Sequence, residues 1–242
     1  LMRSCGITDI GKVRKENQDS FVIERVAGYT LGVVCDGMGG ARSGNVASAL
    51  AAECFTGHIA DRISAGDMLP LPELVREAAI YANVKVYDRA FTDFTCEGMG
   101  TTLVGGVFTD SGAIIANIGD SRAYMISRGV IWQISTDHSY VEELVQKGII
   151  TRKEAKTHPR RNYITRALGI GREVECDVYE ADAEKGNIIL LCSDGLSNML
   201  GDDEMLAAAK EDPSPDGLCK KLMDLALSRE ATDNITVAAF EF

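Results

Sequence analysis

Five aspartates adjoin the most strand-like segments of this chain. Asp36, Asp120 and Asp194 each follow an apolar run, whereas Asp19 and Asp233 come shortly before one. Neighbouring strands of a sheet lie about 5 Å apart, so carboxylates at several strand ends can converge on one edge. At such short distances, carboxylates raise one another's pKa unless a cation neutralises their charge. Several hard carboxylate oxygens without a matching Lys or Arg are what Mg²⁺ or Mn²⁺ requires.

The same residues have a second interpretation, because Asp-Gly pairs are most often tight turns. Asp36 and Asp194 are each followed by glycine, and so is Asp216, which lies in a Pro-rich helix start with no strand before it. We assign no function to Asp216. For the other aspartates, spacing alone does not decide between a tight turn and a metal-binding cluster.

Glycines are concentrated around the first of these aspartates. Gly37, Gly39, Gly40 and Gly44 surround Met38, and glycine lets a backbone carbonyl or amide approach a ligand closely. A dinucleotide-binding fingerprint that starts here needs glycine at position 42, where the chain has arginine, and no G-x-x-x-x-G-K-[S/T] loop occurs anywhere. The sequence therefore excludes both nucleotide-binding loops.

Hydrophobic periodicity predicts the elements that position these residues. Helices are expected at 43–59, from 74 to 86, within 140–156, at 202–211 and from 214 onward, where Pro215 suits the first turn. Thr151 and Glu154 have the spacing of a capping box, so a second short helix is expected to begin there. Strands are expected at 102–108, 113–118, 123–126, 130–134, 174–180, 187–192 and 235–242. Runs of adjacent strands between blocks of helices are typical of an α+β fold with mostly antiparallel sheet.

Composition narrows the class of protein. On a prior of about 150 residues per domain, the 242 residues suit one large domain or two small ones. The sequence has no repeat and no Pro/Gly/Ser-rich linker, so we expect one domain over residues 1–242. No apolar run approaches the ~20 residues that span a bilayer, and the first residues lack a signal-peptide pattern. The net charge of −11 disfavours nucleic acid, which binds clustered Lys and Arg. Seven cysteines, odd in number, are expected to be reduced thiols of a cytoplasmic protein.

Six motifs make the chain similar to a known family. They occur in this order: Arg14-Lys15-Glu16-Asn17-Gln18-Asp19, Val34-Cys35-Asp36-Gly37-Met38-Gly39-Gly40, Gly100-Thr101-Thr102, Ile118-Gly119-Asp120-Ser121-Arg122, Leu191-Cys192-Ser193-Asp194-Gly195 and Thr232-Asp233-Asn234-Ile235-Thr236. Together they resemble the metal-dependent protein phosphatases of type 2C (the PPM family) in their short bacterial form. The resemblance implies a four-layer α-β-β-α sandwich, two antiparallel sheets flanked by helices, with a metal site at one edge.

The resemblance also implies a role for individual residues. Asp36 is expected to bridge two Mn²⁺ or Mg²⁺ ions, with the carbonyl of Gly37 on one of them. Asp194 and Asp233 are expected to hold the other ion. Asp120 and Asp194 are expected to hold a third, more weakly bound ion. Asp19 is expected to orient a bridging water, and Arg14 to bind the substrate phosphate.

This implied site suits hydrolysis of phosphoserine and phosphothreonine in proteins. Two divalent ions activate a shared water and offset the charge of the phosphate, so the reaction needs no catalytic Ser or Cys and no phosphoenzyme. The expected partners are phosphorylated proteins and a cognate serine/threonine kinase. The alternatives are a pseudophosphatase that only binds, for which a damaged metal set is expected, and a dedicated regulator of one partner on the same fold.

Two further features bear on the mechanism. Some relatives carry histidine where this chain has Met38, so proton donation to the leaving group falls to a metal-bound water or to another group such as His138, for which we favour a turn or cap role. Residues 139–166 carry mixed charge and the basic pair Arg160-Arg161. In similar enzymes this region is a mobile flap, so it is expected either to attract acidic phosphopeptides or to be a solvated surface.

Overall fold

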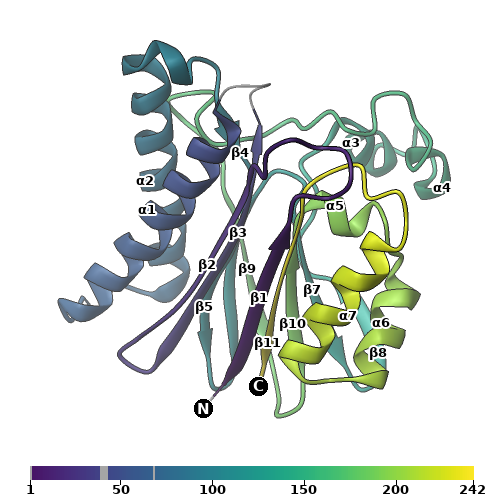
Figure 1. The fold of residues 1–242 in the computed structure, drawn as a ribbon. Helices are drawn as coiled ribbons and strands as arrows, with labels where there is room; N and C mark the ends of the chain where they lie inside the picture. The colour runs from purple at the N-terminus through teal and green to yellow at the C-terminus, as the bar shows by residue number, and fades with distance from the viewer. Residues whose placement is uncertain (1, 39–42, 68) are drawn as a thin grey trace.

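Two antiparallel sheets pack face to face between two layers of helices (Figure 1). The computed structural model describes residues 2–38, 43–67 and 69–242. Gly39, Gly40 and Arg42 of the glycine-rich segment lie outside the described residues. The four-layer α-β-β-α sandwich predicted from the motifs is confirmed.

Each sheet is built from segments that are distant in sequence. One sheet has the order β2 (Asp19–Val26), β3 (Tyr29–Met38), β5 (Leu103–Thr109), β6 (Gly112–Ile118) and β9 (Asp177–Asp182), with the short β4 (Gly100–Thr101) paired to the end of β3. The other has the order β1 (Arg3–Asp9), β11 (Ile235–Glu241), β10 (Ile188–Cys192), β7 (Arg122–Ser127) and β8 (Val130–Gln133). All paired strands are antiparallel, so strand ends and strand starts meet at the same edge.

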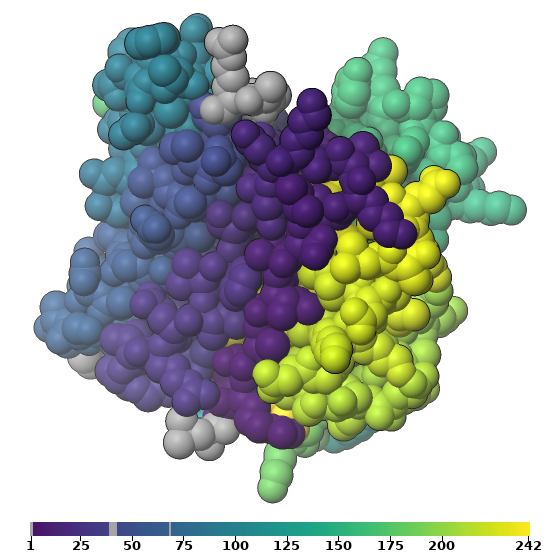
Figure 2. Space-filling view, viewed as in Figure 1, coloured from purple at the N-terminus to yellow at the C-terminus, as the bar shows by residue number. Residues whose placement is uncertain are grey.

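Long helices cover the outer face of each sheet (Figure 1). α1 (Gly44–Ser64) and α2 (Leu71–Thr92) pack on the β2–β3 sheet, and α6 (Asp202–Glu211) and α7 (Pro215–Leu227) pack on the other. The short elements are η2 (Phe94–Cys96), α3 (Tyr140–Gln146), α4 (Arg152–Ala155) and α5 (Asp194–Ser197). The segment with α3 and α4 projects from the sandwich, whereas the N-terminal strand and the turn after it form a purple band between the two helical layers (Figure 2).

Period-two alternation explains how β10 fills two cores at once. Ile188, Leu190 and Cys192 face α6 and α7, whereas Ile189 and Leu191 face the space between the sheets. Successive side chains of a strand point to opposite faces, so a strand buried on both faces is apolar at every position. The inter-sheet layer includes the stacked rings of Phe108 and Phe240, whose centroids are 3.8 Å apart. This layer fixes one sheet against the other below the site.

Several predicted boundaries change in the structure. The helix expected from residue 74 begins at Leu71, so Pro72 lies in its first turn, and the strand expected from 174 begins at Asp177. The 140–156 region forms two helices, as predicted, and the Thr151–Glu154 capping box is present at the start of the second. β3 does not end before Asp36 but continues to Met38, because β4 pairs with it there. Within the described residues, no helix combines the length and apolar character needed to cross a membrane.

Candidate active site

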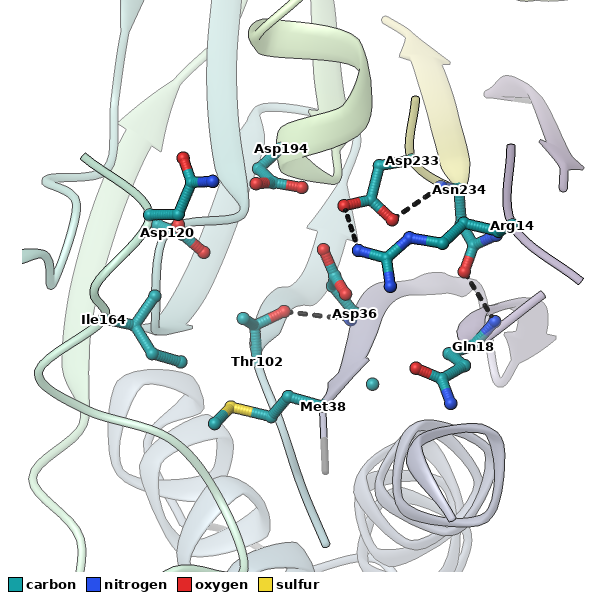
Figure 3. A pocket seen from close by; sticks show the side chains of 12 residues that line it. Arg14, Gln18, Asp36, Met38, Thr102, Asp120, Ile164, Asp194, Asp233 and Asn234 are labelled. Carbon is teal, nitrogen blue, oxygen red and sulfur yellow. Dashed lines mark hydrogen bonds and ion pairs between the residues drawn. The ribbon is translucent and has the colours of Figure 1, made fainter. Parts of the chain in front are cut away.

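A cavity of about 290 Å³ opens at one edge of the sandwich (Figure 3). Six of the seven predicted site residues line it, and Asp19 is buried next to them. The full lining is Arg14, Gln18, Asp36, Gly37, Met38, Thr102, Asp120, Asn162, Ile164, Asp194, Asp233 and Asn234. Residues from both sheets and from the 139–166 segment therefore meet at one place.

The antiparallel topology brings these carboxylates together. Asp194 follows β10 and Asp233 precedes β11, and the two strands pair in opposite directions, so the end of one lies beside the start of the other. Asp19 is paired directly with Asp36 across β2 and β3. Asp120 follows β6 and the left-handed Gly119, whose φ of 108° turns the chain into the site. The convergence inferred from strand ends is thus a consequence of register.

Two threonines fix the backbone of Asp36. The Asp36 amide donates to Thr102 Oγ1 at 2.9 Å, and its carbonyl accepts from Thr102 N and Thr101 Oγ1, both at 2.9 Å. Gly37 follows in a place with no room for a side chain, because a Cβ there would lie 2.0 Å from the Gly44 carbonyl oxygen. The backbone that carries the predicted bridging carboxylate and the neighbouring carbonyl is therefore fixed, which limits the entropy lost when a ligand binds.

Burial and mutual repulsion dominate the electrostatics of the site. Burial, followed by the charges of Asp19 and Asp194, raises the pKa of Asp36 well above its ordinary value. Burial and Asp194 raise the pKa of Asp120 to about 8. Burial raises the pKa of Asp194 as well, and Asp233 adds to the shift. Buried carboxylates that lie this close together bind either protons or a cation.

The donor set fits divalent metal ions. Asp194 Oδ1 is buried and has no hydrogen-bond partner among the described residues, and an orphaned buried oxygen is costly unless a ligand satisfies it. In the described part of the chain, no three His, Cys, Asp or Glu side chains already converge as a metal cage. Mg²⁺ usually binds through one or two carboxylates and keeps several waters, so an open arrangement of oxygens suits it.

Among the described residues, Arg14 is the cationic side chain of the cavity wall. Its Nη2 lies 2.8 Å from Asp233 Oδ2, and the Arg14 side chain is 51% exposed. Figure 3 shows the guanidinium directed into the cavity beside Asp36 and Asp233. A planar guanidinium in this position can recognise two oxygens of a phosphate.

His138 lies beside the cavity wall and does not line it. Its Nδ1 accepts the Gly119 amide at 3.0 Å, which leaves Nε2 to donate to Asp177 Oδ2 at 3.1 Å. The ring is 7% exposed. The structural role favoured from the sequence agrees with this geometry, but the cap of α3 is Ser139, and His138 instead supports the turn that carries Asp120.

Besides Met38, five residues of the wall have no role predicted from the sequence. Three of them lie inside the quoted motifs: Gln18, Thr102 and Asn234. The backbone amide of Gln18 donates to Asn234 Oδ1 at 2.8 Å, which joins the first motif to the last. Asn162 and Ile164 come from the 139–166 segment, where no motif points to them.

Comparison with known proteins agrees with this geometry. The family model described as protein phosphatase 2C matches residues 12–220. The chain belongs to the protein phosphatase 2C family. It is 34% identical over 235 residues to the serine/threonine phosphatase stp of Listeria monocytogenes serovar 1/2a, covering 97% of this chain and 93% of that protein.

Solved structures of this family have the same fold. The serine/threonine phosphatase Stp1 from Staphylococcus aureus superposes with a TM-score of 0.91 at 33% identity, covering 100% of this chain and 95% of that one. The catalytic domain of the serine/threonine protein phosphatase PstP, solved with two manganese ions, gives a TM-score of 0.85 at 33% identity over 99% of this chain and 97% of that one.

Proposed function

We propose that the cavity at the edge of the sandwich is where this serine/threonine protein phosphatase of the 2C family hydrolyses phosphoserine and phosphothreonine in proteins. One observation carries the proposal. Asp36, Asp120, Asp194 and Asp233 meet Arg14 in a single cavity, although they come from segments spread over most of the chain. Crowded carboxylates beside one guanidinium suit a site for divalent ions and a phosphate dianion together.

The residues divide by role. Asp36 and the Gly37 carbonyl would hold one divalent ion, and Asp36, Asp194 and Asp233 the other. Asp120 and Asp194 would hold a third, weaker ion. When bound, Mn²⁺ or Mg²⁺ lowers the pKa of a water and offsets the charge of the phosphate during in-line attack. The PstP structure with two manganese ions supports this cofactor class.

The other side chains bind and orient. Arg14 would exchange its contact with Asp233 for the oxygens of the substrate phosphate. Asp19, held from behind by Ser193 and Thr236 at 2.7 Å each, would orient the attacking water. Met38 in the wall carries no proton to donate to the leaving alkoxide.

A cysteine nucleophile does not suit this site. Cys35 and Cys192 adjoin it in sequence, but both are fully buried, and burial raises the pKa of Cys192 to about 12. The thiolate is the nucleophilic form of cysteine, so these residues act as core side chains. This supports a mechanism in which water attacks the phosphate directly.

Further proposals concern the whole chain. Residues 1–242 would form one catalytic domain with a flap at about 139–166, whose Asn162 and Ile164 reach the cavity. A cognate serine/threonine kinase would supply its phosphoprotein substrates.

All seven cysteines are free, which supports a reducing, cytoplasmic setting.

The decisive experiment is phosphopeptide hydrolysis with Mn²⁺, with and without EDTA. The wild type is expected to turn over only without the chelator. Asp194→Ala is expected to lower turnover by more than about 100-fold. Even the substitution of a residue that only supports a metal ligand lowers metal affinity or activity about 10- to 100-fold. Asp216→Ala is the matched control, since Asp216 also precedes a glycine but lies in the first turn of α7.

Two outcomes contradict the proposal. Hydrolysis that survives chelation removes the metal-dependent mechanism. Binding of phosphopeptides without turnover, at saturating Mn²⁺, identifies a pseudophosphatase instead. Hydrolysis of one phosphoprotein from a panel of unrelated ones favours the dedicated regulator.

A further inference from the structure

A chain of hydroxyl groups ends on the buried carboxylate of Asp19. Its Oδ2 accepts from Ser193 Oγ and from Thr236 Oγ1, both at 2.7 Å. Thr236 Oγ1 also lies 2.7 Å from Thr8 Oγ1, and Thr8 Oγ1 lies 2.9 Å from Asn17 Nδ2. Ser193 and Thr236 are fully buried, so their contacts with Asp19 form inside the protein.

When Asp19 is ionised, the protons in this chain of hydrogen bonds have one possible direction. Thr236 has a single hydroxyl proton, which it donates in the hydrogen bond to Asp19 Oδ2. In the hydrogen bond between the two threonines, Thr8 must therefore be the donor. Thr8 Oγ1 in turn accepts from the Asn17 amide, which is only a donor at Nδ2. Asn17 Oδ1 accepts the Asp19 backbone amide at 3.1 Å, which closes the circuit. Hydrogen bonds aligned in this way polarise and strengthen one another.

The circuit joins the two sheets at the edge that carries the site. Asp19 begins β2 of one sheet, whereas Thr8 and Thr236 face each other on β1 and β11 of the other. Ser193 follows β10, and its Oγ also accepts the Thr236 amide at 3.0 Å. The carboxylate of Asp19 is therefore fixed by groups that the opposite sheet supplies.

Only one oxygen of Asp19 is engaged. Oδ1 is buried and has no hydrogen-bond partner among the described residues. We propose that Thr236, Ser193 and Thr8 are positioning residues, which lock Asp19 through Oδ2 and so keep Oδ1 free for the attacking water. This inference rests on the proposed function, and it adds three hydroxyls to the residues that reaction needs.

The test compares Thr236→Val, which removes the hydroxyl at nearly constant volume, with Thr236→Ser, which retains it. Thr56→Val is the matched control, because Thr56 is also buried and its hydroxyl donates to the Ala52 carbonyl within α1. With saturating Mn²⁺ we expect Thr236→Val to lower kcat by about 10-fold or more with KM nearly unchanged, since only orientation in the transition state is lost. Thr236→Ser is expected to recover most of kcat. Thr8→Val is expected to have a smaller effect, because Thr8 is exposed and water can replace its hydroxyl.

A second readout needs no metal and no substrate. In the metal-free protein, Thr236→Val is expected to lower Tm by about 2–4 °C, the cost of one buried hydrogen bond in a chain of this size. The same substitution is expected to change Tm far less in an Asp19→Ala background, because the acceptor is already gone.

The outcomes separate this inference from the proposed function. An active wild type with additive Tm shifts, or with an unchanged kcat in Thr236→Val, overturns the positioning role alone. A kcat loss equal to that of Thr56→Val also overturns it. A wild type without metal-dependent hydrolysis overturns the proposed function, and the positioning role then falls with it, even where the Tm shifts are not additive.

Discussion

Arg14 Nη2 lies 2.8 Å from Asp233 Oδ2, although the two residues are 219 positions apart in the sequence. We expect one to bind phosphate and the other a metal ion, yet here each serves as the counter-charge of the other. Their side chains are 51% and 37% exposed, and exposed ion pairs contribute at most about 1 kcal/mol. The pair is therefore weak enough to separate when a cation and a phosphate take its place.

Arg14→Ala is expected to raise KM for a phosphopeptide by about 10-fold or more, because a charged two-point contact to the phosphate is lost. The affinity for Mn²⁺, measured by calorimetric titration, is expected to stay the same or to rise, since Asp233 loses a competing cation. Arg128→Ala is the control, because Arg128 forms a comparable exposed ion pair with Glu184 away from the cavity. Weaker Mn²⁺ binding with an unchanged KM contradicts this assignment.

The stability of the metal-free protein is expected to fall as pH rises. Burial is the main cause that raises the pKa of Asp19 to about 7 and of Asp120 to about 8, against about 3.9 in an unfolded chain. Between these values the folded protein binds more protons than the unfolded chain, so the free energy of unfolding decreases with pH. In EDTA, Tm is expected to drop from about pH 5 to about pH 8.5.

Saturating Mn²⁺ is expected to abolish this drop, because a bound cation stabilises the ionised carboxylates. Asp120→Asn without metal is expected to melt higher than the wild type near pH 8 and to show a flatter pH dependence. A Tm that rises with pH in EDTA contradicts the raised pKa values.

His138→Ala is expected to keep turnover within about 10-fold of the wild type, because His138 does not line the cavity. It removes the contacts of the ring with Gly119 and Asp177, so Tm is expected to fall by about 4–8 °C. His138→Asn, whose side-chain oxygen can still accept the Gly119 amide, is expected to recover part of that loss. A loss of turnover of about 1000-fold in a folded variant indicates general-acid catalysis instead.

Ile164 is expected to affect substrate recognition. It lines the cavity from the 139–166 segment, whereas Ile149 lies in the same segment outside the cavity wall and is 64% exposed. Ile164→Ala is expected to raise KM for phosphopeptides by about 10-fold, the value of lost apolar contact in a substrate site, and to leave p-nitrophenyl phosphate hydrolysis unchanged. Ile149→Ala is expected to change neither. Equal effects of the two substitutions contradict a role for the flap in recognition.

Local patterns determined much of this protein from the sequence alone. The helix at Asp202–Glu211 has the predicted bounds, and the Thr151–Glu154 capping box is present, because capping and periodicity depend on residues a few positions apart. Asp36, Asp120 and Asp194 were recognisable for the same reason, since each lies within two residues of the end of an apolar run.

Tertiary structure decided what depends on pairing between distant segments. The β1 strand was not predicted, because as an edge strand it is only half buried and is defined by its partner β11. Likewise β3 continues through Asp36 because β2 pairs with it there, and on to Met38 because β4 pairs with Gly37 and Met38. The contact of Arg14 with Asp233 and the hydroxyls on Asp19 depend on register between strands, and a shift of one residue would turn those side chains to the other face. The local sequence thus identifies the site residues, whereas the packing of the two sheets determines which of them contact one another.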